Sequence, residues 1–248
     1  ERLEHFDRFR SQRQATARSA ATAVTQPEVF SEYNAWHARR ALREIDARYF
    51  QEHVSSLWKR HPFFEFIVVL SPGQEPLLAD TLDSLMAQYF DGWRLSVFAG
   101  CPSPDPEFVS ETSKVCWVDV SQGALIDAVN RKILHSTATW FGLFACGVSF
   151  SPQALLVCGD YISIHPEWRL IYTDDDTVEE DGSLTTPKFK PDFNPDLLRS
   201  TDYVGGFFIE RKALIGAGGY VENPGGEHYD VLLRAFDSQE KGAIGHIA

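Results

Sequence analysis

From Phe64 onward, short apolar runs alternate with amphipathic stretches, and this alternation limits the possible folds more than any other feature of the chain. The runs are rich in β-branched and aromatic residues and end in turn signals such as Ser71-Pro72-Gly73, which predicts buried strands. They span 64–70, 94–99, 115–120, 140–148, 169–172 and 204–210. Helical spacing of apolar residues follows at 76–89, 123–135, 152–161, 211–215 and 227–236. This order predicts an α/β fold with a mostly parallel sheet and helices on both faces, with ligands at the carboxyl ends of the strands.

Three consecutive carboxylates, Asp174, Asp175 and Asp176, come at or just past the end of the predicted strand 169–172. Adjacent carboxylates repel one another unless a cation, a basic side chain or water compensates them. One interpretation is a site for a divalent ion and a phosphorylated ligand. The other is a solvated acidic loop, because Asp181-Gly182 is a hairpin turn signal.

Two lysines, Lys188 and Lys190, follow these acids on a segment that is expected to be extended. Their charges could offset a phosphate, or they could pair with the three aspartates themselves. Both interpretations stay open from the residues alone.

The composition excludes several classes of protein. The 248 residues suit one large domain or one domain with an appendage, and the net charge of −12 argues against nucleic acid as the main partner. The four cysteines lie far apart without a CxxC pair, which favours buried thiols in a reducing cytoplasm. The longest apolar run, 140–150, is too short to cross a bilayer. We therefore expect a cytoplasmic protein, either free or peripheral at the inner face of the membrane.

Residues 1–60 are predicted to form an N-terminal helical extension, and the main domain is predicted to span 61–248. The chain starts at Glu1 and stops at Ala248 without a helix cap, so we expect a piece of a longer protein. One apolar stripe at helical spacing is expected to pack against the main domain. Its members are Tyr33, Trp36, Ala41, Ile45, Tyr49, Val54 and Trp58. The arginine and histidine clusters between them fit either acidic lipid headgroups or an ordinary solvated face.

Several separate segments match a known family. Residues 31–36 contain the motif Tyr-x-x-Trp. Residues 172–176 read Tyr-Thr-Asp-Asp-Asp, and they are followed by Asp-Gly at 181–182 and by Phe-Lys-Pro-Asp-Phe-Asn-Pro-Asp-Leu-Leu at 189–198. Further along, the chain contains Gly-Gly-Tyr at 218–220 and Tyr-Asp-Val-Leu-Leu-Arg at 229–234. Together they resemble the family 2 glycosyltransferases of GT-A fold, in particular the bacterial branch that builds O-antigen and other surface polysaccharides, rhamnosyltransferase-like members included. The resemblance covers about residues 31–248.

The resemblance implies a GT-A, Rossmann-like domain that continues past Ala248. It also implies transfer of a sugar from a nucleotide-diphosphate sugar to a saccharide or lipid-linked saccharide acceptor, with inversion. In such chemistry a divalent cation, Mg²⁺ or Mn²⁺, neutralises the charge of the departing diphosphate, and a base takes the acceptor proton.

The chain departs from the family pattern where the family carries its donor-site carboxylates. The family's Asp pair after the second strand is replaced by Ala99-Gly100. Its Asp-x-Asp element after the fourth strand is replaced within 144–148, Phe-Ala-Cys-Gly-Val. His228 stands where the base Asp is expected. The resemblance therefore implies an altered active site.

The remaining candidates form two groups. Asp174, Asp175, Asp176 and Lys190 are predicted to bind substrate, with Asp174 and Asp176 as the candidate metal ligands. Near the start of the last predicted helix, His228, Asp230 and Glu227 are the candidate catalytic bases, since an imidazole takes a proton near neutral pH. Acids in a first helical turn also stabilise the helix dipole without any catalytic role.

Two functions remain open. The first is an active glycosyltransferase with an altered, metal-independent or metal-shifted site. The second is a catalytically silent GT-A domain that binds a saccharide, a nucleotide or a neighbouring domain in a larger polysaccharide-assembly protein.

Overall fold

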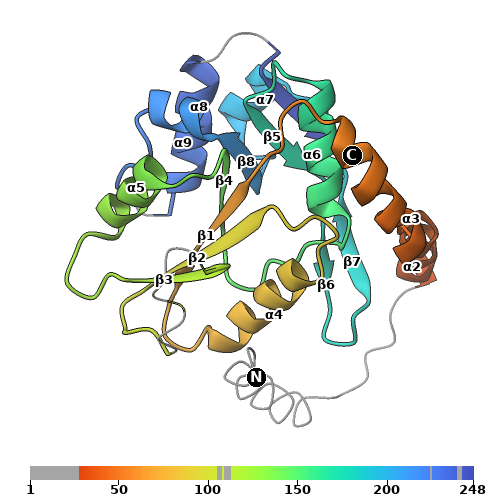
Figure 1. Cartoon of the computed structure of the whole chain (residues 1–248), viewed down its shortest axis with the longest axis horizontal. Helices are drawn as coiled ribbons and strands as arrows, with labels where there is room; N and C mark the ends of the chain where they lie inside the picture. Colours follow the sequence, from red (N-terminus) through yellow and green to blue (C-terminus); the bar gives the residue numbers. More distant parts are fainter. Residues whose placement is uncertain (1–27, 105–107, 109–112, 224, 239–241) are drawn as a thin grey trace.

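The computed structural model describes residues 28–104, 108, 113–223, 225–238 and 242–248. Within them, seven strands form one sheet in the order β3-β2-β1-β4-β8-β5-β9 (Figure 1). The strands are β1 Phe64–Leu70, β2 Trp93–Ala99, β3 Val115–Asp119, β4 Trp140–Phe144, β5 Leu170–Thr173, β8 Phe207–Glu210 and β9 Ile244–Ile247. All neighbouring pairs are parallel except those of β8, which runs antiparallel to both β4 and β5. The predicted mostly parallel α/β sheet is therefore confirmed.

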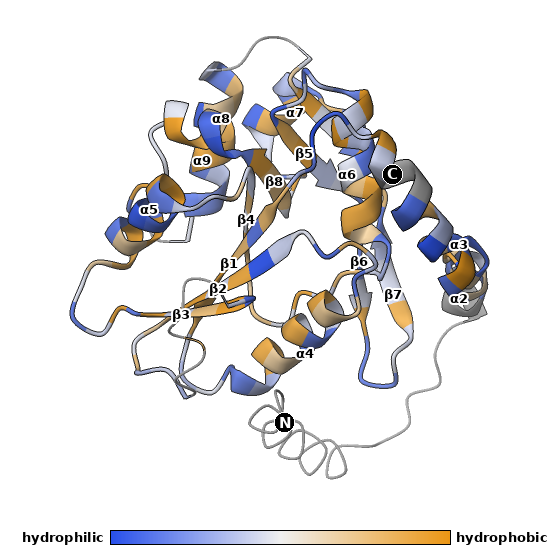
Figure 2. Cartoon of the chain, in the orientation of Figure 1, coloured by the Kyte–Doolittle hydropathy of each residue, from blue (hydrophilic) through white to orange (hydrophobic). Residues whose placement is uncertain are grey.

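Helices cover both faces of this sheet, as predicted. They are α4 Glu75–Met86, α5 Leu125–His135, α6 Ala154–Ile164, α7 Pro195–Ser200, α8 Arg211–Gly216 and α9 Glu227–Ser238. α4 and α6 pack with the strand residues of one apolar cluster, whereas α5, α8 and α9 pack with the other. Alternate residues of β1 enter opposite clusters, since Phe66 and Val68 join the first and Ile67 the second. Figure 2 shows the central strands as mainly hydrophobic and α5 and α9 as mixed.

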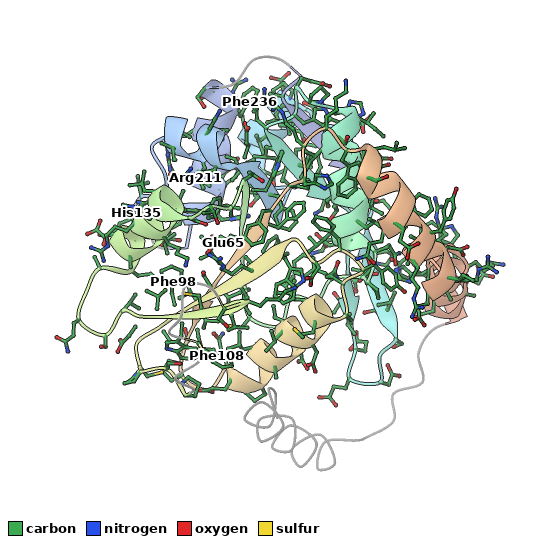
Figure 3. The ribbon with its side chains drawn as sticks, in the orientation of Figure 1. Glu65, Phe98, Phe108, His135, Arg211 and Phe236 are labelled. Carbon is green, nitrogen blue, oxygen red and sulfur yellow. The ribbon has the colours of Figure 1, made fainter. Side chains whose placement is uncertain are left out.

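A buried carboxylate interrupts the apolar core on the α5 side. Glu65 of β1 is fully buried and lies near the centre of the molecule in Figure 3. Ser96 Oγ donates a hydrogen bond of 2.7 Å to it, Ser136 Oγ donates another, and Lys132 Nζ lies 3.4 Å from Glu65 Oε1. The charge is thus compensated by a cation and two hydroxyl groups, as a buried ion requires.

The N-terminal region is helical where it is described. It contains α2 Glu28–Arg40 and α3 Glu44–Tyr49, a π-helical turn at Phe50–Val54 and a 3₁₀ turn at Ser55–Leu57. Residues 1–27 of the predicted extension lie outside the described residues, and the division at residue 60 stays a prediction. The predicted continuous apolar stripe is wrong, because α2 ends at Arg40: Trp58 is buried, whereas Ile45 is 72% and Tyr49 60% exposed.

Several elements differ from the sequence prediction. The predicted buried strand 140–148 ends at Phe144, because the chain turns through Gly147 at a φ of 90°. β9 was not predicted. Residues after β5 form a separate two-stranded hairpin of β6 Asp175–Val178 and β7 Leu184–Lys188, with the predicted turn at Asp181-Gly182.

The cysteines form no disulfide among the described residues. Cys116 and Cys158 are buried as predicted, Cys146 is half-buried and Cys101 is exposed, so the prediction of buried thiols is wrong for Cys101. None of the helices in the described part of the chain combines the length and the apolar content that a bilayer crossing requires.

Candidate functional site

The acidic triplet, Asp174 to Asp176, lies at the carboxyl end of β5, where the chain leaves the sheet and enters the hairpin β6–β7. Successive side chains of a strand point to opposite faces, so neighbouring carboxylates here face different surroundings. Each of the three contacts a different segment of the protein.

Asp174 connects the end of β5 to β9. Its Oδ1 accepts a hydrogen bond of 2.8 Å from the backbone N–H of Lys190 and lies 2.9 Å from His246 Nε2. The other imidazole nitrogen lies 3.4 Å from Asp192 Oδ1, and the ring stacks on Tyr172 with 4.8 Å between centroids. His246 therefore lies between two carboxylates, and it was not among the site residues predicted from the sequence.

Asp175 pairs with lysine side chains of the same region. Lys190 Nζ lies 2.6 Å from Asp175 Oδ2 and donates a hydrogen bond of 2.7 Å to the carbonyl of Val204; the Lys190 side chain is only 6% exposed. Lys188 Nζ lies 3.3 Å from the same carboxylate. Burial acts to raise the pKa of Asp175, but the hydrogen bonds and charges of the two lysines outweigh it, and the pKa lies below its usual value. Of the two interpretations of Lys188 and Lys190, pairing with the acids is the one that the structure shows.

Asp176 binds the N-terminal extension. Its Oδ2 accepts a hydrogen bond of 2.7 Å from Tyr33 Oη on α2. Burial and this bond raise the pKa of Tyr33 well above its usual value. Beside it, the Asn34 amide bonds both the backbone N–H and the carbonyl of Leu184 on β7, each at 2.8 Å. The Tyr-x-x-Trp motif was the sequence signal for this contact, although the motif did not reveal its partner.

The predicted metal ligands, Asp174 and Asp176, have protein partners in the structure. Among the described side chains, no three His, Cys, Asp or Glu groups are placed to hold one together. Asp174 and Asp176, the predicted metal ligands, face His246 and Tyr33 respectively. The predicted metal role of these two aspartates stays a prediction.

His228 lies at the start of α9 and contacts the segment that leads into β8. Its Nε2 lies 2.8 Å from the carbonyl oxygen of Gly205, and a carbonyl only accepts, so Nε2 carries the proton. Nδ1 is buried without a hydrogen-bond partner among the described residues, and the ring stacks on Phe207 at 4.1 Å. Burial lowers the pKa of His228 below its usual value, although the hydrogen bond to Gly205 and the charge of Asp202 act in the opposite direction.

The two carboxylates beside His228 differ in their contacts. Asp230 Oδ2 accepts bonds from Arg234 Nη2 at 2.7 Å and Nε at 2.9 Å, and Arg234 Nη2 also donates to the carbonyl of Gly219 at 2.7 Å. Asp230 thus holds the arginine that ties α9 to the Gly-Gly-Tyr turn. Glu227 is partly exposed in the first turn, and its carboxylate makes no hydrogen bond or ion pair within the described part of the chain.

Gly205 brings the two groups of candidates together. A Cβ at this position would lie 3.6 Å from both Asp175 Oδ2 and Lys190 Nζ, and its carbonyl contacts His228. Its φ of 62° is in the left-handed region that favours glycine. The structure therefore places Asp175, Lys190 and His228 around one glycine.

In the other half of the sheet, β2 and β4 end without carboxylates at the places of the family's donor-site acids. β2 ends at Ala99 and is followed by Gly100, which has open space where a side chain would be. After β4, Cys146 Sγ lies 3.6 Å from the carbonyl of Val69, and Gly147 packs near Leu77. Both predicted departures from the family pattern therefore stand at the edge where ligands bind.

Comparisons with known proteins agree with this architecture. No family model matches the chain. It is 31% identical over 235 residues to the O-antigen biosynthesis protein RfbC of Myxococcus xanthus, covering 91% of this chain and 18% of that protein. It is 29% identical over 197 residues to an uncharacterised protein of Sinorhizobium fredii, y4gI, covering 75% of this chain and 22% of that protein. The chain thus spans about a fifth of the length of these relatives.

Solved structures match the fold at low sequence identity. The S. aureus TarS fragment 1–349 superposes with a TM-score of 0.56 at 14% identity, covering 75% of this chain and 58% of that one. The mannosyltransferase PcManGT of Pyrobaculum calidifontis, in complex with GDP-Man and Mn²⁺, superposes with a TM-score of 0.51 at 11% identity, covering 82% and 64%.

These superpositions show that the chain has the GT-A fold, as the sequence predicted. In sequence, the chain is similar to the O-antigen biosynthesis protein over most of its length, which agrees with the predicted resemblance to the O-antigen branch of the family 2 glycosyltransferases.

Proposed function

We propose that this domain transfers a sugar from a nucleotide-diphosphate sugar to a saccharide acceptor during assembly of a surface polysaccharide. The observation that carries the proposal is the match to an O-antigen biosynthesis protein over 91% of the chain. Two further findings support it. A structural neighbour, TarS, was solved in complex with UDP, and PcManGT with GDP-Man. The polar candidates of this chain lie at the carboxyl edge of the sheet, where α/β folds bind ligands.

The proposed reaction is a single displacement with inversion. The acceptor oxygen forms a bond to the anomeric carbon as the bond to the diphosphate breaks, and the acceptor proton passes to a base. We assign this base to Glu227 in preference to Asp230, because the Asp230 carboxylate is bonded to Arg234. His228 is neutral and can accept a proton only at Nδ1, which is buried in the present orientation.

A silent GT-A domain is the second candidate. It is favoured by one observation, that β2 and β4 end without carboxylates while each member of the acidic triplet has a protein partner. Such a domain would bind a saccharide, a nucleotide or another part of a longer chain.

Calorimetric titration with UDP, GDP and dTDP, with and without Mn²⁺, tests the donor site. We expect binding of one nucleotide. Mn²⁺-dependent binding that is lost in Asp174→Asn would support the predicted metal role of Asp174. No binding of any of the three would refute donor chemistry and leave the silent domain.

Turnover is then measured with a sugar donor that carries the nucleotide found to bind, and variants of the candidate bases show which of them takes the acceptor proton. We expect Glu227→Gln to lower kcat at least about a hundredfold, the usual contribution of a general base. Equal turnover in wild type and Glu227→Gln, together with loss in His228→Ala, would move the role to His228.

We further propose that the reaction takes place in the cytoplasm, at the inner face of the membrane, where a lipid-linked acceptor would be available. Fractionation of cells expressing the full-length protein checks this location, and recovery outside the cytoplasmic and inner-membrane fractions would refute it.

A further inference from the structure

Three aromatic rings form an exposed cluster beside the acidic triplet. Tyr33 and Trp36 come from α2, and Phe189 follows β7 directly. Tyr33 and Trp36 stack at 5.8 Å between centroids, and Phe189 meets them edge-on at 6.2 Å and 6.1 Å. Phe189 is 64% exposed, more than any other aromatic side chain in the described residues, and Trp36 is 38% exposed.

Hydrogen bonds between α2 and the hairpin β6–β7 hold this cluster in place. Tyr33 is bonded to Asp176, and Asn34 is bonded twice to the backbone of Leu184. These bonds attach α2 to the hairpin through groups other than the exposed ring of Phe189. The hydrogen bonds therefore fix the support of the Phe189 ring while most of its surface stays in contact with water, and an exposed group of aromatic rings is typical of binding surfaces.

The surroundings of Phe189 are polar and charged. Lys188, with a side chain 64% exposed, precedes it, and the Arg40 guanidinium lies 4.6 Å from the centroid of the Trp36 ring. Arg40 covers one face of Trp36, so Phe189 offers the more open ring. An aromatic face with hydrogen-bond donors around it matches a sugar ring, which has an apolar face of C–H groups and a rim of hydroxyl groups.

The cluster is also connected to the candidate site. Phe189 lies between Lys188 and Lys190 in the chain, and both lysine ammonium groups contact Asp175. Consecutive Cα atoms are about 3.8 Å apart, so Phe189 lies one residue from each of the two lysines that contact Asp175. A ligand that stacks on Phe189 would therefore lie close to the acidic triplet.

We infer that Phe189, with Trp36 beside it, forms a subsite for the saccharide chain of the acceptor. This inference rests on the proposed function and specifies where the acceptor binds. Phe189 supplies the stacking surface, and Lys188 and Arg40 supply hydrogen bonds to hydroxyl or acidic groups of the sugar.

The test measures saccharide and nucleotide binding separately in the same chain. Short O-polysaccharide fragments from Myxococcus xanthus, the organism of the O-antigen relative, are titrated by calorimetry, and UDP, GDP and dTDP are titrated in parallel. We expect Phe189→Ala to weaken saccharide binding at least tenfold and to leave nucleotide binding within twofold. Phe189→Tyr should keep saccharide affinity, because it keeps the ring.

Ile45→Ala is the matched control, since Ile45 is equally exposed on α3 but lies outside the cluster. It should change neither affinity, and the Tm of each variant confirms that it folds. Equal saccharide affinity in wild type and Phe189→Ala would overturn the inference. The inference would also be overturned if the wild type bound a nucleotide but no saccharide, and in that case the proposed donor site would still be supported. Saccharide binding that requires Phe189 without nucleotide binding would support the subsite and count against sugar transfer. Binding of neither would overturn both.

Discussion

The two halves of the sheet's carboxyl edge are built from different chemistry. In the half formed by β1 to β4, Gly100 follows β2 and Gly147 comes shortly after β4, whereas β3 ends at Asp119, which accepts a hydrogen bond from the backbone N–H of Ser121. At the end of β5, three carboxylates stand together, and each is bonded to a residue that is distant in the chain or follows the hairpin. Buried apolar residues fill both halves, and the second half adds a network of charges at this edge.

This difference shows how side chains of the protein compensate the acidic triplet. Repulsion among the three carboxylates is offset separately, by His246 and the backbone N–H of Lys190, by the buried Lys190 ammonium, and by the Tyr33 hydroxyl. The triplet therefore joins the N-terminal helix, the hairpin and the last strand at one place.

The largest effect is expected at Glu65, a charged group that is buried in the first half. Glu65→Ala leaves Lys132 and the hydroxyls of Ser96 and Ser136 without their acceptor, and breaking such a buried pair costs about 3–5 kcal/mol. Urea denaturation measures the loss. Glu210→Ala, which removes a partly exposed pair with Arg169, is the control and should cost under about 1 kcal/mol. Similar losses in both variants would show that the core, and not the buried pair, holds this half.

A smaller loss is expected when the network of the second half loses its cation. Lys190→Met leaves Asp175 and the Val204 carbonyl without their shared donor, and charged hydrogen bonds contribute about 1.5–3 kcal/mol. Lys188→Met is the matched control, because Lys188 contacts the same carboxylate from an exposed position and should cost under about 1 kcal/mol. A larger loss in Lys188→Met than in Lys190→Met would contradict the central place of Lys190.

The attachment of α2 should depend on one hydroxyl group. Tyr33→Phe removes the bond to Asp176 and is expected to destabilise this attachment by about 1 kcal/mol. Hydrogen exchange of the α2 amides should accelerate while exchange in β1 stays unchanged. Tyr161→Phe, whose hydroxyl makes no hydrogen bond in the described part of the chain, should leave both unchanged. If amide exchange in α2 is unchanged in Tyr33→Phe, the hydrogen bonds of Asn34 and the aromatic contacts with Phe189 are sufficient to attach α2 to the hairpin.

The smallest effect concerns acid pH. The lowered pKa of Asp175 means that its contribution is fully present above the unfolded-state value of about 3.9 and is lost as the pH falls through the folded-state pKa. The stability difference between wild type and Lys190→Met should therefore shrink between about pH 5 and about pH 3. Because the Asp175 side chain is 39% exposed, solvent limits this change. A stability difference that stays constant over this range would show that Lys190 stabilises the fold independently of Asp175.

The sequence predicted the first half better than the second. β1, β2, β3 and α5 follow from local periodicity, because each buries a regular apolar pattern. The antiparallel direction of β8 and the existence of β9 did not follow, since short strands of four residues carry little pattern. The stripe through Ile45 failed because α2 and α3 are separate helices.

The candidate site was predicted in position but not in its contacts. The triplet was expected at a strand end and lies there, whereas its partners Tyr33 and His246 are far away in the chain and no local pattern connects them. The pairing of Lys190 with Asp175 was foreseen as one alternative, because the two lie on adjoining segments. The contact of Gly205 with His228 was not predicted, because the two residues are 23 positions apart in the chain and only the fold brings them together.

The pairing of β9 with β5 has a consequence for synthesis of the protein on the ribosome. β5 lies between β8 and β9 in the sheet, and both of these strands come later in the chain, with β9 following α9. While the chain emerges, β5 therefore has neither neighbour, and an unpaired apolar strand is a template for pairing with other chains. The acidic triplet directly after β5 places charge at the end of this unpaired strand, so the same residues that join three segments in the finished fold also oppose aggregation before it is complete.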